Sequence, residues 1–138
     1  DAKYSSDKTI TIFDNGVHRK HNLDYSRALE IDAKSKKILW EYADDPVFSF
    51  YSYFGGGVDC LPNGNYLICE TAKGQLFEVT RDKKVVWEYI SPFFYGNPRL
   101  GGRMNATFRA HRYGVEYPGL KDRKLDPESY ANLNRLLD

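Results

Sequence analysis

Short segments in which apolar and polar residues alternate follow one another along most of the chain. The first, Lys8–Asp14, alternates β-branched and aromatic residues and ends at Asn15-Gly16, a pair typical of turns. Further segments of this kind, separated by polar turn residues, lie at Arg27–Asp32, Ile38–Tyr42, Val58–Leu61, Tyr66–Glu70, Gly74–Thr80 and Lys84–Ile90. We therefore predict an all-β fold built from hairpins of short strands.

Two stretches of the chain are close repeats of each other. Residues 27–42 read RALEIDAKSKKILWEY and residues 75–89 read QLFEVTRDKKVVWEY, so that Trp40 and Trp87 lie forty-seven residues apart. A period of this length made of short strands is typical of a β-propeller blade. Because the Trp-Glu-Tyr sequence recurs in both units, we assign it to packing between blades rather than to a functional site.

The repeat sets the domain organisation that we expect. Residues 1–138 form a partial β-propeller with blade elements at 8–43 and 57–91 and with a final strand and C-terminal tail at 103–138. The final strand is predicted at Ala106–Tyr113, and a short C-terminal helix is predicted from Asp126, an N-cap residue followed by proline, to Leu137. Known propellers have at least four blades, so we expect another polypeptide to complete the ring.

Composition and charge narrow the choice of partners. Aromatic residues make up 15% of the chain, which suits strands, and the formal net charge is only +1. A charge so close to neutral argues against a partner that is nucleic acid or a membrane surface. The sequence also has no apolar run of about 18 residues, which a membrane-spanning helix requires, and its first residues lack a signal-peptide pattern.

The two cysteines and three histidines do not form a recognisable metal motif. Cys60 and Cys69 flank a predicted Asn-Gly hairpin, which places them diagonally on one face, at a separation that disfavours a disulfide. We expect buried thiols there. Their spacing matches no zinc template, so we expect no metal site at these residues.

Two segments carry residues that suit an anionic ligand. The turn residue Asn15 and the following His18 and Arg19 belong to a polar loop that suits an oxyanion, although a solvated loop explains them equally well.

In the second segment, FRAHRY, a strand would place Arg109, His111 and Tyr113 on one face and Arg112 on the other. Such a face suits an anion, and it equally suits salt bridges between blades.

The order of these motifs resembles the C-terminal part of the arylsulfotransferase family. The resemblance rests on ITIFDNG, SRALEID, ILWEY, LPNGN, VVWEY and FRAHRY, and it extends over about residues 8–130. It implies a propeller of six blades when complete, a periplasmic or secreted location, and transfer of a sulfuryl group between phenols through a histidine intermediate. It also implies a small aromatic or sulfated substrate and a reaction that requires neither a metal nor an organic cofactor.

Within this resemblance the candidate residues have different roles. His111, Arg109 and Arg19 are the catalytic candidates, and the substrate-binding candidates are His18, Asn15, Arg112 and Tyr113. The family has its nucleophilic histidine just before the ITIFDNG segment, where this chain has only DAKYSSD. We therefore expect the nucleophile to be supplied from outside this chain.

Three functions remain open at this point. The chain is part of a sulfuryl-transferring enzyme, a non-catalytic propeller module that binds a protein or small ligand, or an enzyme of the same architecture with different chemistry on an aromatic or anionic substrate.

Overall fold

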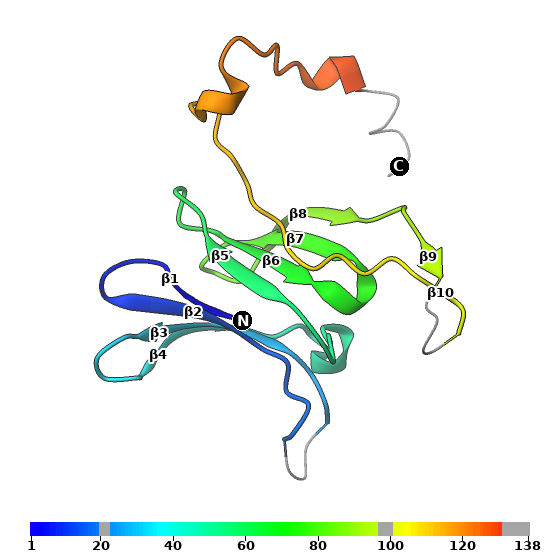
Figure 1. The fold of residues 1–138 in the computed structure, drawn as a ribbon. Coiled ribbons are helices and arrows are strands. Elements are labelled where there is room, and N and C mark those ends of the chain that lie inside the picture. The colour runs from blue at the N-terminus through cyan, green and yellow to red at the C-terminus, as the bar shows by residue number, and fades with distance from the viewer. Residues whose placement is uncertain (20–22, 97–100, 131–138) are drawn as a thin grey trace.

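The chain folds into two four-stranded antiparallel sheets that pack face to face, followed by a long C-terminal tail (Figure 1). The computed structural model describes residues 1–19, 23–96 and 101–130. The first sheet contains β1 (Ala2–Tyr4), β2 (Thr9–Asp14), β3 (Arg27–Asp32) and β4 (Ile38–Tyr42). The second contains β5 (Gly57–Cys60), β6 (Tyr66–Glu70), β7 (Gln75–Val79) and β8 (Val85–Ile90). The predicted all-β class is confirmed.

The remaining elements of the described residues are short. A two-stranded ribbon is formed by β9 (Tyr95–Gly96) and β10 (Arg103–Met104). Single 3-10 turns occur at η1 (Val47–Ser49), η2 (Thr71–Lys73), η3 (Pro118–Leu120) and η4 (Pro127–Tyr130). In the part of the chain that the structure describes, no helix is long and apolar enough to cross a membrane.

The strands of each sheet are hydrogen-bonded in sequence order, and the two sheets repeat each other in register. Glu30 lies opposite Trp40 in the first sheet, and Glu78 lies opposite Trp87 in the second. The register shifts directly after each glutamate. The sequence repeat is thus a repeat of backbone geometry, and strands paired in order are the arrangement of a propeller blade.

The hydrophobic core lies between the two sheets. Alternate residues of β2, β3 and β4 face alternate residues of β5, β6 and β7, and the buried cluster comprises Phe13, Ala28, Trp40, Tyr42, Phe50, Val58, Tyr66, Ile68, Phe77 and Val79. Rings dominate the contact: Trp40 stacks on Tyr66 with centroids 3.8 Å apart. This core leaves each sheet with an outer face that points away from the other sheet, since side chains alternate along a strand.

One prediction about the tail is wrong, and another falls mostly outside the described residues. Ala106–Tyr113 is not a strand, because this segment crosses the outer face of the second sheet (Figure 1), where its backbone cannot join a ladder. Of the helix expected from Asp126 to Leu137, Pro127–Tyr130 form the 3-10 turn η4, and residues 131–138 lie outside the described residues. The three-residue strand β1, which pairs with β2, was not predicted.

Candidate functional site

The first candidate group surrounds Asp14, at the end of β2 where the loop to β3 begins. Its Oδ2 atom accepts hydrogen bonds from Arg19 at 2.6 Å and from Arg27 at 2.8 and 3.0 Å. Burial acts to raise the pKa of Asp14, but the bonds from the two guanidinium groups outweigh it and lower that pKa below its ordinary value. Asp14 is therefore a stable negative centre at neutral pH.

Arg19 is fully engaged by its surroundings. Besides Asp14, its guanidinium group donates to the Tyr25 carbonyl at 2.9 Å and lies 4.0 Å from the centre of the Tyr25 ring. Gly16, with a φ of +74°, lets the loop pass this close, because a Cβ atom there would meet the Tyr25 oxygen at 2.0 Å. These contacts give Arg19 a role in shaping the loop.

Asn15 and His18 belong to the same loop. The Asn15 side chain donates to the Ser52 and Gly55 carbonyls at 2.7 and 2.5 Å, which fixes the loop to the segment that connects the two sheets. His18 is exposed at its surface. The two residues thus share one loop, but the Asn15 side chain amide is occupied by backbone carbonyls.

The second group lies where the tail crosses the outer face of the second sheet. Arg109 forms an ion pair with Asp1 at 3.3 Å, and His111 Nδ1 lies 3.4 Å from Asp59 Oδ2. Asp59 also pairs with Lys3. Burial and the nearby Arg109 lower the pKa of Lys3. Three basic side chains are thus gathered around two carboxylates, although the acidic partners were not predicted.

The other two predicted residues of the tail point to different neighbours. Arg112 pairs with Glu78, and its guanidinium carbon lies 4.8 Å from the centre of the Trp87 ring. Tyr113 packs against Tyr117, with ring centroids 4.2 Å apart. Tyr113 therefore does not share a surface with Arg109 and His111 as a strand would require. Arg19 is in a separate group, and no described residue is bonded to both groups.

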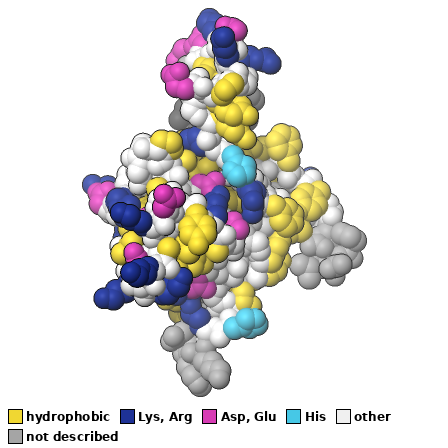
Figure 2. Space-filling model, turned by 60° about the vertical axis from the view of Figure 1, so that its left-hand side comes forward, with side chains coloured by type: hydrophobic (Ala, Val, Ile, Leu, Met, Phe, Trp, Pro, Cys, Tyr) yellow, Lys and Arg dark blue, Asp and Glu magenta, His cyan; other side chains and the backbone are white. Residues whose placement is uncertain are grey.

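The two groups differ most clearly in the solvent exposure of their basic side chains. The side chains of Arg109 and His111 are 57% and 52% exposed, whereas that of Arg19 is 17% exposed. On the surface seen in Figure 2, Lys and Arg side chains alternate with Asp and Glu rather than forming one basic patch. Among the ion-paired basic side chains of the two groups, those of Arg109 and His111 are therefore the most accessible to a small anion.

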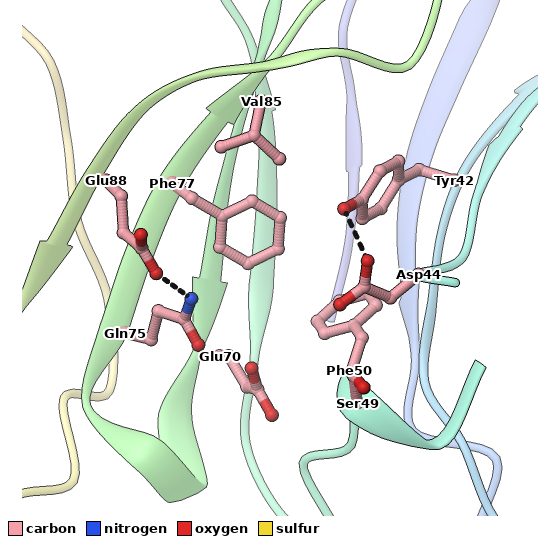
Figure 3. Close-up of a pocket in the computed structure, with 9 residues that line it drawn as sticks. All are labelled: Tyr42, Asp44, Ser49, Phe50, Glu70, Gln75, Phe77, Val85 and Glu88. Atoms are coloured by element: carbon pink, nitrogen blue, oxygen red, sulfur yellow. Dashed lines mark hydrogen bonds between the residues drawn. The ribbon is translucent and has the colours of Figure 1, made fainter. Parts of the chain in front are cut away.

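A cavity between the two sheets was missed by the sequence analysis. It has a volume of about 230 Å³ and is lined by Tyr42, Asp44, Ser49, Phe50, Glu70, Gln75, Phe77, Val85 and Glu88 (Figure 3). Glu70 is almost completely buried, and burial raises its pKa even though Lys73 pairs with it at 2.8 Å. Its carboxylates make this cavity unsuitable for a sulfate group.

The cysteines are both free thiols. Cys69 is buried and Cys60 is half-buried, and burial raises the pKa of each above its ordinary value. Within residues 1–19, 23–96 and 101–130, no group of three or more acidic, histidine or cysteine side chains is arranged to hold a metal ion.

Comparison with known proteins identifies the family. The model of the family described as Arylsulfotransferase (ASST) matches residues 1–92, which includes both four-stranded sheets. No curated protein and no solved structure matches the chain. The tail that carries Arg109 and His111 lies beyond the matched residues, so their assignment rests on the resemblance of FRAHRY and on their geometry. The match spans well over half of the sequence, and the chain belongs to the arylsulfotransferase family.

Proposed function

We propose that this chain is part of an arylsulfotransferase-like β-propeller that transfers a sulfuryl group from an aryl sulfate to a phenol. The observation that carries the proposal is the family match over both sheets. Another polypeptide, or further chain outside residues 1–138, supplies the remaining blades and the nucleophilic histidine.

Sulfuryl transfer needs a nucleophile and cationic side chains around the sulfuryl group. A neutral imidazole nitrogen attacks the sulfur of the donor, the new N–S bond forms as the S–O bond to the aryl group breaks, and the donor leaves as phenolate. An acceptor phenol then loses its proton and attacks the same sulfur, which breaks the N–S bond and restores the imidazole. Negative charge on the sulfuryl oxygens is stabilised by Arg and His⁺ side chains.

Within this chain we assign that cationic role to Arg109 and His111. Both side chains are more than half exposed, and their carboxylate partners hold them on the same surface. Arg19 and Asn15 act as positioning residues, since their side chains are bonded to Asp14 and to backbone carbonyls. His18, Arg112 and Tyr113 are not in contact with this surface through any bond in the described part of the chain.

The test is the rate of sulfate transfer from an aryl sulfate to a phenol, measured on the complete assembly. Arg109→Ala and His111→Ala are expected to lower kcat about 10²–10³-fold, because each removes a donor to charge that develops in the transition state. Arg123→Ala, an exposed position on the same tail, is the matched control and is expected to retain the parent rate. Normal rates in both site variants would reject the site assignment.

A second function has one observation in its favour. Arg19, Arg109, His111 and Arg112 each lie within ion-pair distance of a carboxylate, which is also the pattern of a binding module whose charges are structural. A folded assembly that transfers no sulfate from any aryl sulfate would favour this module, or an enzyme with different chemistry, over the transferase.

A further inference from the structure

Three aromatic rings form the apolar part of the cavity between the two sheets. They belong to Tyr42 of β4, to Phe50 next to η1 and to Phe77 of β7, and their centroids lie 5.9, 5.8 and 5.5 Å apart in pairs. Ring faces carry partial negative charge, so they accept a cation as well as an apolar group. The volume of about 230 Å³ exceeds the roughly 150 Å³ that holds one benzene molecule, so a ligand with one ring has room in the cavity.

Three carboxylates line the same cavity. Asp44 lies on the side of the first sheet, and Glu70 and Glu88 lie opposite it on the second sheet (Figure 3). Burial and the charges of these three carboxylates raise the pKa of Tyr42 to about 12, so the three charges act together at the Tyr42 hydroxyl. Lys73 pairs with Glu70 at 2.8 Å, and no described residue forms an ion pair with Asp44 or Glu88. The cavity therefore has a surplus of negative charge.

One oxygen of the buried glutamate is available to a ligand. The Glu70 side chain is only 2% exposed and points into the cavity (Figure 3). Its Oε1 atom accepts a hydrogen bond from the Tyr51 amide at 2.9 Å and lies 2.8 Å from the Lys73 ammonium nitrogen. Its Oε2 atom accepts no hydrogen bond from any residue that the structure describes. A ligand with an N–H donor can therefore bind Oε2 without displacing either partner of Oε1.

These walls suit an organic cation better than other ligands. The carboxylates repel an anion, and within the described ranges no group of acidic side chains is arranged to hold a metal ion. A neutral ring would fill the space but would offset none of the negative charge. An ammonium group on an apolar body contacts the carboxylates with its charge and the rings with its hydrocarbon part.

We propose that this cavity binds a small primary amine in its protonated form, attached to a ring or a short hydrocarbon. The ammonium group donates to Glu70 Oε2 and is attracted by Asp44 and Glu88, while the hydrocarbon part packs on the three rings. Glu88 is exposed to solvent and lies at the mouth of the cavity, where it attracts the cation. No residue of the tail group that contains Arg109 and His111 lines this cavity, so the proposal does not rest on sulfate transfer.

The experiment is a calorimetric titration of the full chain with benzylammonium chloride at pH 7, for which we expect one saturable site. Two further probes of similar shape test the chemistry. Benzyl alcohol lacks the charge, and benzyltrimethylammonium has the charge but no N–H donor. Each is expected to bind about tenfold or more weakly, because a hydrogen bond to a charged group is lost. Absence of saturable benzylammonium binding, or equal affinity for either comparison probe, would overturn the proposal.

Substitutions of similar shape locate the site. Asp44→Asn and Glu88→Gln each remove one negative charge and are expected to weaken benzylammonium binding about tenfold. Glu70→Gln removes the buried carboxylate that holds the ammonium group and is expected to abolish measurable binding. Asp45→Asn, at an exposed neighbour that does not line the cavity, is the matched control and is expected to bind like the parent.

Two results of this series would count against the site. Parent affinity in folded Asp44→Asn and Glu88→Gln would overturn the proposal, and so would an equal loss in the Asp45→Asn control. Circular dichroism of every variant separates these results from unfolding. Because sulfate transfer is not measured, failure of this proposal and failure of the proposed function remain distinguishable.

Discussion

Trp40 and Trp87 come from the same repeated sequence and occupy the same register position, but they have different surroundings. Trp40 is 7% exposed under a neighbouring sheet, and Trp87 is 41% exposed beside Arg112 of the C-terminal tail. The sequence of a repeat unit thus determines the shape of its sheet. Burial of the repeated residues is decided by the segment that lies against them, because each unit buries its outer face only through a neighbour.

The largest expected effect is the difference in stability between alanine variants of the two tryptophans. Trp40→Ala leaves a cavity between the sheets and is expected to lower the free energy of unfolding by about 3–5 kcal/mol. Trp87→Ala removes a half-exposed ring and is expected to lower it by about 1 kcal/mol. Urea unfolding of both variants measures the difference. Equal losses would show that the two tryptophans are packed alike and would contradict their different surroundings.

A smaller effect is expected at the hydroxyl group that links the sheets. Tyr66→Phe removes a hydrogen bond to the buried Glu30 carboxylate and is expected to lower the free energy of unfolding by about 2 kcal/mol. Tyr113→Phe is the control, because Tyr113 is exposed on the tail. If the two variants unfold at the same urea concentration, the Tyr66–Glu30 bond contributes nothing measurable.

The smallest effect is a pH dependence that differs in sign between two glutamates. Burial acts to raise the pKa of Glu30, but hydrogen bonds from Tyr66 and Arg81 outweigh it and lower that pKa below 4.5. Glu30 therefore stabilises the fold above pH 4.5, and this contribution is lost as the pH falls through its folded pKa. Burial raises the pKa of Glu70 above 4.5, so protonation of Glu70 in the folded state adds stability as the pH falls toward 4.5.

Glutamine variants isolate the two contributions. The free energy of unfolding is measured from pH 7 to pH 3 for the parent and both variants. Its decrease at the acid end is expected to be smaller in Glu30→Gln than in the parent. In Glu70→Gln, the increase in the free energy of unfolding that the parent shows as the pH falls toward 4.5 is expected to be absent. Parallel pH profiles for the parent and both variants would contradict the opposite pKa shifts.

The parts predicted from the sequence are those that local patterns determine. Alternation along the β2–β3 and β6–β8 segments predicted these strands, and the two Trp-Glu-Tyr sequences predicted the repeat. The strand β1 was missed because three residues are too few to show a pattern. Ala106–Tyr113 has strand-like alternation, but it lies across a sheet face, and this placement depends on contacts such as Arg112–Glu78 that join distant parts of the chain.

The candidate site was predicted less completely for the same reason. Arg109 and His111 were selected by residue type, and the structure brings them to one surface. Their acidic partners Asp1 and Asp59 are far away in the sequence and carry no motif. Arg19 was also selected by residue type. Its enclosure by Asp14 and Tyr25 depends on a turn at Gly16 that composition does not reveal.

The origin of the nucleophile is the most direct test of the proposed function. The complete assembly is incubated with an aryl sulfate, without an acceptor, and its peptides are examined by mass spectrometry for a histidine that carries a sulfuryl group. The account predicts this modification on a histidine outside residues 1–138, with His18, His21 and His111 unmodified. A sulfuryl group on any of these three histidines, or no modified histidine anywhere in a folded assembly, would contradict it.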